Sequence, residues 1–429
     1  VVDSGIYGSD DLRMGGRDRT SRIVARRSFV EKDSKGKQED PCGHGSAVAG
    51  VIAGNGHLSD LRMNQRLYTT RTFRGVAPAA DLIDVRVLDQ QGRGSASGVI
   101  AALDWCIVNR DRYNIRVVNL SLGHPPVESY RTDPLCRAVE DTTRAGILVV
   151  CAAGNRGRVN PDVNDGRVAY GTINSPGNSP YALTVGAANT QSTRSPADDV
   201  ITSYSSRGPA RGDRVLKPDL VAPGNRIISI RHWASYLEKS VAPRNLVPTD
   251  YYWSKPTGVY SDYFILSGTS LAAGFASGAA ALLFQQDPDL TPGDVKARLM
   301  KSALKTWRTD GIASDIFSRG AGYLNIPAAL ACRDRVPGYA LSPACSVVAG
   351  RLVLNRTPGD VAADSRQSVC GSQALWGDRA LWGDQALWGD QALWGDQALW
   401  GDQALWGDQA LWGDQALWGD ISRTAVLGD

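Results

Sequence analysis

The sequence predicts an α/β fold over residues 1–330, with a doubly wound, mostly parallel sheet and helices on both of its faces. Short β-branched apolar runs alternate along this stretch with segments of helical spacing. The strand runs are apolar almost throughout, as expected when helices cover both faces of a parallel sheet. Of the 429 residues 42% are hydrophobic, which is enough for a sizeable core. In such a fold the active site is expected at the carboxyl ends of the strands.

The individual elements follow from these patterns. Asp133 and Pro134 are typical of a helix N-cap and the first helical residue after it. The helical stretches each fill the gap between two apolar runs, which is the order of a parallel sheet with crossover helices. We therefore expect strands at 82–88, 117–122, 147–153 and 182–186, and helices at 96–109 and 133–145.

Beyond residue 330 this alternation stops. Residues 331–372 are rich in Pro, Arg, Ser and Gly, and we interpret them as a linker. Residues 373–420 hold eight copies of the hexapeptide QALWGD, with one change at Arg379, and residues 421–429 form a tail. The chain is thus expected to contain one large domain followed by a separate repeat segment.

The period of six argues against a regular amphipathic helix, whose period is about 3.6 residues. It fits the period of two of a strand, with Gly-Asp as a turn. Three arrangements stay open: a hexad solenoid, a meander of four-residue strands, and a segment that is disordered until bound. Because a ladder of Trp side chains is hard to leave exposed, we favour an ordered β-type stack. Its Trp faces could bind carbohydrate or a cell surface, or the segment could be a spacer without a ligand.

Composition excludes several functional classes. The net charge is only +3 and no basic cluster stands out, which argues against nucleic-acid binding. The longest nearly apolar run, 271–284, has 14 residues, whereas a membrane-spanning helix needs roughly 20. No signal peptide is visible. The chain opens on VVDSG, which looks like a strand cut short, so we expect its natural beginning to be missing.

The seven cysteines are an odd number, so at least one is unpaired within the chain. Cys106 and Cys151 lie in apolar runs and are expected to be small core residues. Cys332, Cys345 and Cys370 lie in or near the predicted linker, where one disulfide would suit an oxidising compartment. No cysteine or histidine spacing is typical of zinc.

Four residues stand in settings that suit hydrolytic chemistry. His44 lies between two glycines before a run of small apolar residues, and Ser270 begins a helix that is apolar on all sides. Asp3 and Asn155 each end a strand pattern. Each has a simpler alternative: a core or surface histidine, a serine N-cap, an aspartate that caps a loop, or an asparagine that caps a turn. Their combination is far more specific than any one of them.

The other three histidines are weaker candidates for a general base. His57 and His232 lie in polar surroundings and are expected at the surface, whereas His124 follows a strand end and would border a cleft. The sequence GTSLA around Ser270 is not the G-x-S-x-G elbow of α/β-hydrolases. The candidates also follow one another as Asp, His and Ser, whereas the catalytic residues of α/β-hydrolases follow the order Ser, Asp or Glu, His. A lipase or esterase is therefore disfavoured.

In chain order, these motifs resemble those of the subtilisin-like serine peptidases, the subtilases. The order Asp, His, Ser is the order found in subtilisin. The resemblance extends over residues 1 to about 330 and rests on nine ordered matches. These are VVDSG, GHGSAVAG, GVAPAADL, NLSLG, AAGN, SYSSRGP, KPDLVAPG, GTSLAAG and GAGYLNIPAAL.

The resemblance implies a role for each matching residue. Ser270 would be the nucleophile, His44 the general base and acid, and Asp3 the residue that orients His44. Asn155 would donate to the oxyanion together with the backbone N–H of Ser270. The protein would then be a serine endopeptidase that acts on protein and peptide substrates.

The substrate-binding residues also follow from the resemblance. An extended substrate would pair as an added strand with Ser121, Leu122 and Gly123. None of the residues that would form the first specificity pocket is a carboxylate able to hold Lys or Arg, so we expect broad specificity with an apolar or aromatic preference. These pocket residues are Cys151, Ala152, Ala153 and Gly154, with Asn174 near the floor.

The sequence departs from the family pattern at four positions. Ser46 and Ala47 stand where Thr and His are usual, Leu271 replaces Met, and Gly274 replaces Pro. None of these changes removes a reacting atom. The short start is a larger concern, since only two residues precede Asp3 and could leave it poorly held.

The resemblance also bears on partners, cofactors and location. A prodomain, absent from this sequence, would be the folding partner and inhibitor, and the protein would be secreted. No cofactor is expected for the chemistry. Structural calcium is a feature of many relatives, but residues 162–166 (DVNDG) are more typical of a polar turn. The alternative function is a weak or vestigial peptidase fold that binds surfaces through its Trp repeats.

Overall fold

The computed structural model describes most of the first 355 residues and one short segment of the repeats. The described residues are 1–14, 20–30, 40–60, 69–160, 166–241, 244–253, 261–305, 315–348, 351–355 and 417–419. The remainder of the chain, including all but three residues of the repeat segment, lies outside this set. The predicted β-type stack of the repeats therefore falls on residues outside this set.

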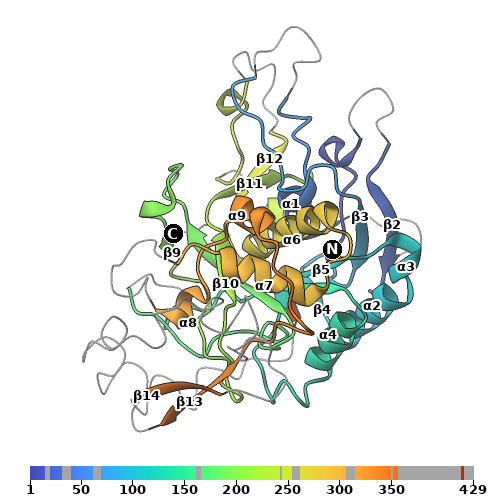
Figure 1. The fold of residues 1–429 in the computed structure, drawn as a ribbon. Coiled ribbons are helices and arrows are strands. Elements are labelled where there is room, and N and C mark those ends of the chain that lie inside the picture. The colour runs from blue at the N-terminus through green and yellow to red at the C-terminus, as the bar shows by residue number, and fades with distance from the viewer. Residues whose placement is uncertain are drawn as a thin grey trace.

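A central sheet of eight strands organises the domain (Figure 1). Seven strands pair in parallel, and β9 adds to β8 in the antiparallel sense. The predicted doubly wound α/β class is confirmed. In sheet order the strands are β10 (Leu220–Pro223), β8 (Leu183–Asn189), β7 (Leu148–Ala152), β5 (Val117–Leu120), β1 (Val2–Asp3), β3 (Leu82–Arg86) and β2 (Ile23–Ser28), with β9 (Val200–Ile201) beside β8.

The chain enters this sheet at its middle. β1 pairs with β3 on one side and with β5 on the other, so the strand order reverses direction there. Such a switch point leaves a crevice outside the carboxyl ends of the strands, and ligands bind in it. Asp3 is the last residue of β1 and therefore lies at that crevice.

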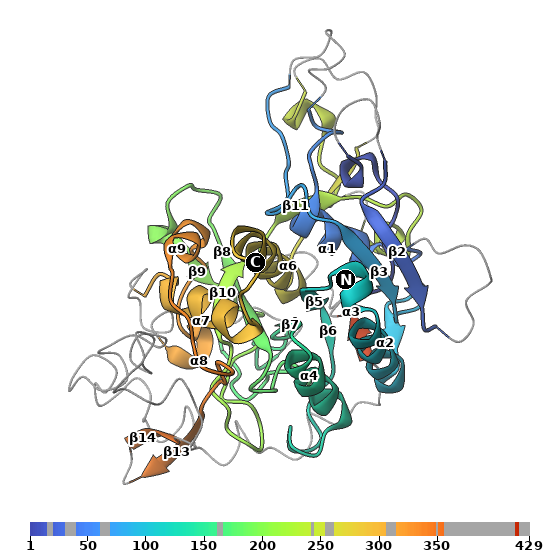
Figure 2. The same cartoon turned by 45° about the vertical axis from the view of Figure 1, so that its right-hand side comes forward.

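Helices cover both faces of the sheet (Figures 1 and 2). On β7, Val150 and Ala152 belong to the core cluster that contains α6, whereas Val149 and Cys151 belong to the cluster that contains α2 and α4. This alternation is the period-two pattern of a strand buried on both sides. The helices in question are α6 (Thr269–Gln286) with α1 (His44–Ala53) on one face, and α2 (Ala96–Val108) with α4 (Pro134–Arg144) on the other.

The apolar run at 271–284 forms most of α6, the longest helix among the described residues. It is buried at most positions and contacts strands β5, β7, β8 and β10. Within the described part of the chain, no helix has both the length and the apolar character needed to cross a bilayer. The run is thus a core helix of the domain.

Shorter elements complete the described fold. Asp133 caps α4 as predicted, with its Oδ1 accepting from the backbone N–H of Leu135 at 2.9 Å. The other elements are η1 (Asp10–Leu12), β4 (Arg93–Gly94), α3 (Arg110–Tyr113), β6 (Leu122–Gly123), η3 (Pro196–Asp198), β11 (Ile227–Ile230), α5 (Tyr236–Val241), η4 (Thr249–Tyr251), β12 (Tyr263–Leu266), α7 (Pro292–Ser302), α8 (Ile316–Arg319), α9 (Ile326–Ala331), β13 (Ala344–Val348), β14 (Arg351–Asn355) and β15 (Leu417–Gly419).

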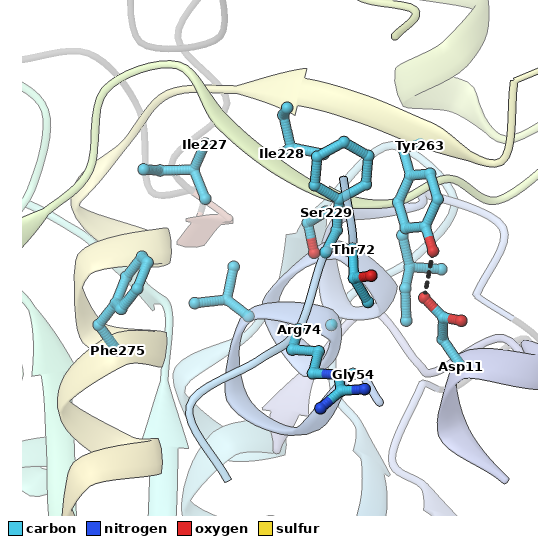
Figure 3. A pocket seen from close by; sticks show the side chains of 13 residues that line it. Asp11, Gly54, Thr72, Arg74, Ile227, Ile228, Ser229, Tyr263 and Phe275 are labelled. Carbon is cyan, nitrogen blue, oxygen red and sulfur yellow. Dashed lines mark hydrogen bonds between the residues drawn. The ribbon is translucent and has the colours of Figure 1, made fainter. Parts of the chain in front are cut away.

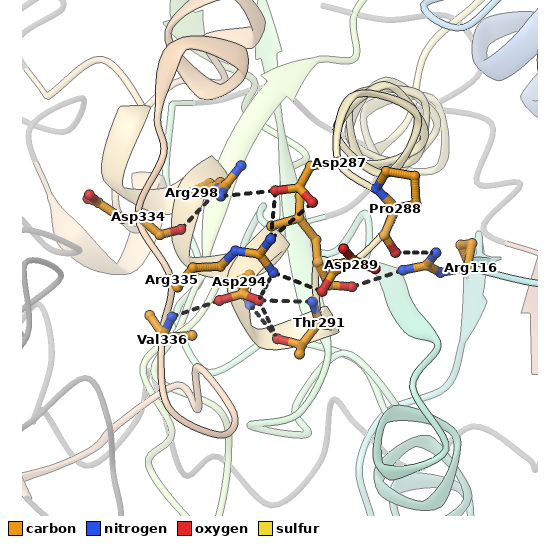
Figure 4. Close-up of polar contacts among 11 residues, drawn as sticks. Arg116, Asp287, Pro288, Asp289, Thr291, Asp294, Arg298, Asp334, Arg335 and Val336 are labelled. Carbon is orange, nitrogen blue, oxygen red and sulfur yellow. Dashed lines mark hydrogen bonds and ion pairs between the residues drawn. The ribbon is translucent and has the colours of Figure 1, made fainter.

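The segment expected to be a linker is partly built into the domain. Arg335 forms a two-point ion pair with Asp287, and the backbone N–H of Val336 donates to Asp294 at 2.7 Å (Figure 4). Val336 and Cys345 are also part of the main hydrophobic core. β13 and β14 then form an antiparallel hairpin. The linker prediction for 331–372 is therefore corrected for its first half, because its apolar side chains complete the core beside α7.

The six cysteines in the described residues are free thiols, five of them buried. Cys106 and Cys151 are core residues, as predicted. Cys332 and Cys345 do not form the disulfide considered for this region, and Cys370 lies outside the described residues. Burial raises the pKa of Cys151 to about 12, so this thiol stays protonated and unreactive at neutral pH.

Candidate active site

Asp3 and His44 meet at the switch point of the sheet. Nδ1 of His44 lies 2.8 Å from Oδ1 of Asp3, whose side chain is 1% exposed. The backbone N–H of Ser4 donates to the same oxygen at 2.7 Å. Because an ionised carboxylate can only accept hydrogen bonds, Nδ1 of His44 carries the proton and donates it. The sequence-predicted pair is thus brought into direct contact.

The glycines around His44 permit this contact. A Cβ on Gly45 would lie 2.2 Å from the carbonyl oxygen of Gly5, so any side chain there would force α1 away from the end of β1. Gly43, the N-cap of α1, has a φ of 92°, a region that side chains disfavour. The glycines thus let His44 begin a helix against the strand that carries Asp3.

Asp40 holds this arrangement together and was missed in the sequence. Its carboxylate accepts from the backbone N–H groups of Gly43 at 2.7 Å and Ser46 at 2.8 Å, and from the hydroxyl of Ser4 at 2.7 Å. Ser4 in turn accepts from the backbone N–H of Gly45 at 3.0 Å. The buried carboxylate therefore ties the start of α1 to the residue after Asp3. An aspartate three residues before a glycine N-cap was the available signal.

His232 is buried, contrary to the prediction that it lies at the surface. It is 8% exposed, and its ring stacks on Tyr7 with centroids 4.4 Å apart. Its Nδ1 contacts the backbone carbonyl of Asp40. The polar neighbours in its sequence suggested exposure, but the ring packs on Tyr7 and contacts the backbone of Asp40, residues far away in the sequence. His124, in contrast, is half-buried beside Ser175, with which its backbone pairs.

Ser270 is the second residue of α6 and not its N-cap, which is Gly268. Its hydroxyl donates to the carbonyl of Ser121 at 3.3 Å, and the hydroxyl of Ser121 donates back to the carbonyl of Ser270 at 2.9 Å. The N-cap alternative for Ser270 is therefore wrong. The two residues join the start of α6 to the end of β5.

Two further buried side chains continue this connection. Asn119 donates to the hydroxyl of Ser121 at 2.9 Å and accepts from the hydroxyl of Ser277 at 2.9 Å. All of these groups are buried, so each needs its partner. Sequence reasoning missed Asn119 and Ser277, because only the packing of α6 on β5 brings them together.

Asn155 is oriented by Thr269. Its Oδ1 accepts from the backbone N–H of Thr269 at 3.0 Å and from the Thr269 hydroxyl at 3.1 Å. The point that a Cβ on Gly268 would occupy lies 3.4 Å from Nδ2 of Asn155 and 3.8 Å from the backbone nitrogen of Ser270. The amide nitrogen of Asn155 and the Ser270 N–H therefore flank one small space, which Gly268 leaves open.

The predicted specificity-pocket residues also gather. A Cβ on Gly154 would lie 2.9 Å from Nδ2 of Asn174, and one on Gly123 would lie 3.0 Å from Cβ of Asn174. The backbone N–H of Asn174 donates to the carbonyl of Ala153 at 3.0 Å. β6, which contains Leu122 and Gly123, follows directly on Ser121. Asn174 thus lies against Gly123, Ala153 and Gly154.

A cavity of about 200 Å³ lies elsewhere, between α1 and β11. The hydroxyl of Tyr263 donates to Asp11 across one side of it at 2.7 Å (Figure 3). Burial raises the pKa of the Asp11 carboxyl and that of the Tyr263 hydroxyl. None of the four predicted catalytic residues lines this cavity.

No metal site is apparent in the described residues, among which no group of three His, Cys, Asp or Glu side chains could hold an ion. The turn at 162–166 considered for calcium lies almost wholly outside the described residues. Structural calcium therefore stays an expectation of the family resemblance alone.

The sheet brings Asp3 and His44 into contact at the ends of its parallel strands, and comparison with known proteins gives the family of the chain. Residues 1–323 match the profile described as the Subtilase family, so the chain belongs to the subtilases. It is 38% identical to serine protease AprX of Bacillus subtilis (strain 168) over 343 residues, 79% of this chain and 65% of that protein. It is 30% identical to subtilisin E of the same organism over 331 residues, 77% of this chain and 64% of that protein.

The chain thus spans about 65% of the length of these two relatives. A crystal structure described as a cold adapted subtilisin-like serine proteinase aligns with a TM-score of 0.48 at 26% identity, over 76% of this chain and 85% of that one.

Proposed function

We propose that this chain is a serine endopeptidase in which Ser270 attacks the substrate carbonyl. His44 takes the hydroxyl proton and returns it to the leaving amine, while Asp3 keeps the ring in place and stabilises the imidazolium. The observation that carries the proposal is the 2.8 Å contact between His44 Nδ1 and the buried Asp3. With Nδ1 protonated, the lone pair of the neutral ring is at Nε2, where a general base needs it.

The space flanked by Asn155 and the Ser270 N–H supports the second half of the mechanism. A tetrahedral intermediate places a negative oxygen near the nucleophile, and two preorganised donors stabilise it. The two hydrogen bonds from Thr269 to the Asn155 oxygen fix the orientation of the Asn155 amide beside this space. Losing one such side-chain donor costs a factor of about 10²–10³ in kcat.

The substrates we propose are proteins and peptides in extended form. The backbone of Ser121, Leu122 and Gly123 offers an edge for an added strand. By the family resemblance, Cys151, Ala152, Ala153 and Gly154 would wall the pocket beside it, with Asn174 near its floor. No carboxylate is among these residues, which favours apolar or aromatic side chains over Lys and Arg.

A fluorophosphonate probe tests the nucleophile directly, because it forms a covalent bond only with an activated serine. We expect the full chain to be labelled at Ser270 and the S270A variant to stay unlabelled. The matched control is S302A at the end of α7, where the hydroxyl donates to a backbone carbonyl of its own helix at 3.4 Å. Equal labelling of the S270A variant would refute the assignment.

Three expectations are part of this proposal and stay predictions. They are export from the cell, a prodomain acting as folding partner and inhibitor, and the absence of a cofactor in the chemistry. The alternative, a vestigial peptidase fold that binds surfaces through its repeats, predicts no probe labelling of correctly folded protein.

A further inference from the structure

One segment of the repeat tail forms a strand at the candidate active site. β15, in the eighth hexapeptide, pairs antiparallel with both β4 and β6 and completes a three-stranded sheet. Trp418 lies opposite Gly123 on one side and opposite Arg93 on the other. Figure 2 shows this segment as the short red strand near β6. The tail therefore inserts its backbone between two edges of the domain.

This position is the one that the proposed function assigns to the substrate. β6 begins directly after Ser121, whose carbonyl accepts from the hydroxyl of Ser270. Gly419 lies opposite Leu122, one position nearer to Ser121 than the pair formed by Trp418 and Gly123. Because β15 is antiparallel to β6, its chain direction leads towards Ser121 and Ser270. An extended substrate would need the same backbone partners.

We infer that the QALWGD repeats are tethered ligands of the substrate cleft, each able to enter between β4 and β6 as a third strand. The inference rests on the proposed function, since it identifies the cleft as the substrate site. Binding of this kind would also explain why the hexapeptide is repeated. Each of the eight copies offers the same backbone and the same Leu-Trp-Gly sequence to one binding edge.

Tethering allows a weak contact to compete with substrate. A strand of three residues is marginal by itself. Attached to the same chain, however, it is present at an effective concentration of the order of millimolar, and identical copies multiply the chance of occupancy. Sixty-one residues separate the end of β14 from the start of β15, and this stretch contains seven complete hexads. If one hexad binds with a Kd of about 0.1–0.5 mM, an effective concentration of about 1 mM would raise the apparent KM about three- to tenfold.

The test replaces the central residue of the paired triplet in every hexad. Proline at the Trp position removes the N–H that the added strand presents and disfavours a paired strand. The control places the same number of prolines at the first position of each hexad, outside the paired triplet. The test variant carries Pro at Trp376, Trp382, Trp388, Trp394, Trp400, Trp406, Trp412 and Trp418, and the control carries Pro at Gln373, Arg379, Gln385, Gln391, Gln397, Gln403, Gln409 and Gln415.

We expect the test variant to hydrolyse an extended peptide substrate with a KM about three- to tenfold lower than the full natural chain and the same kcat, while the control keeps the natural KM. Active sites are counted with the fluorophosphonate probe in all three proteins. Equal probe labelling with three identical KM values would overturn the inference and leave the proposed function intact.

A binding measurement keeps the inference testable if no protein is labelled, an outcome that defeats the proposed function alone. A dye-labelled acetyl-QALWGD-amide peptide should bind the test variant about three- to tenfold more tightly than the natural chain, because the cleft is no longer occupied. The same peptide with Pro for Trp should not bind. Equal affinity of the hexapeptide for both proteins would contradict the inference.

Discussion

Replacing Asp40 by Asn should slow catalysis without changing any proposed reacting group. The carboxylate of Asp40 accepts three hydrogen bonds, from the N–H groups of Gly43 and Ser46 and from the Ser4 hydroxyl. It is fully buried. An Asn side chain has the same shape but only one acceptor oxygen. Its NH₂ group must therefore face at least one of these donors, which then loses its partner.

The size of the effect follows from the count of lost contacts. If the amide oxygen faces Gly43 and Ser4, the N–H of Ser46 loses a bond to a charged acceptor, worth about 1.5–3 kcal/mol. The start of α1 also loses a negative charge at its positive end, worth about 0.3–1 kcal/mol. We expect unfolding free energy to fall by about 2–4 kcal/mol. A helix start displaced by about 1 Å would lower kcat up to about a hundredfold.

The values of kcat and KM are measured for D40N on a peptide substrate. The free energy of unfolding is measured in urea for D40N combined with S270A, because the S270A substitution removes self-digestion. The matched control is D294N at the start of α7 (Figure 4). Asp294 is equally buried and accepts from the N–H and hydroxyl of Thr291 and from the N–H of Val336. Its substitution should cost similar stability but leave kcat unchanged.

The comparison separates positioning from general destabilisation. D40N should lower kcat about 10- to 100-fold with KM changed less than about threefold, because the ring of His44 is misplaced while the substrate edge is intact. An unchanged kcat in D40N, or an equal fall in D294N, would refute the positioning role of Asp40.

Two further substitutions test other buried groups. Burial lowers the pKa of Lys296 to about 7, so the native protein binds fewer protons than the unfolded chain above that pH, and stability should rise by at most about 4 kcal/mol from pH 7 to 10. The buried Lys217 also has a lowered pKa and contributes to this rise, so urea unfolding of K296M in the S270A background should show a smaller rise than S270A alone. An equal rise in the two proteins would contradict the assignment to Lys296. S277A should leave Asn119 without its donor and lower unfolding free energy by about 1–2 kcal/mol, with kcat reduced several-fold. An unchanged kcat in S277A would show that the hydrogen bond between Asn119 and Ser277 does not help to position Ser270.

The sequence was sufficient to predict the fold class because local patterns and the sheet agree. The run expected as a strand at 147–153 forms Leu148–Ala152, and the helix expected at 96–109 forms Ala96–Val108. Both signals come from neighbouring residues. The linker prediction failed for the opposite reason, since the contacts of Val336 and Cys345 with the core join segments far apart in the chain.

The same distinction applies to the site. The four predicted residues stand in short motifs that can be recognised locally. Asp40 and His232 lie 192 positions apart, yet their contact helps to hold the start of α1. No local pattern indicates such a contact, and the polar sequence around His232 suggested the surface. Residues that position a site through long-range hydrogen bonds therefore need the folded structure to be found.

The contacts that fix Asp3 show why a very short strand can position a functional carboxylate. β1 has two residues, and its shortness led us to expect a loosely held side chain. The strand is nevertheless firmly anchored, because it lies in the middle of the sheet and pairs with β3 on one side and β5 on the other. The carbonyl of Asp3 accepts from the N–H of Val87 at 2.8 Å, and its carboxylate accepts from Ser4 and contacts His44. Because both its backbone and its side chain are hydrogen-bonded, Asp3 is held in place although its strand is short. The expectation of a poorly held Asp3 is therefore wrong for physical reasons that concern the sheet and not the length of β1.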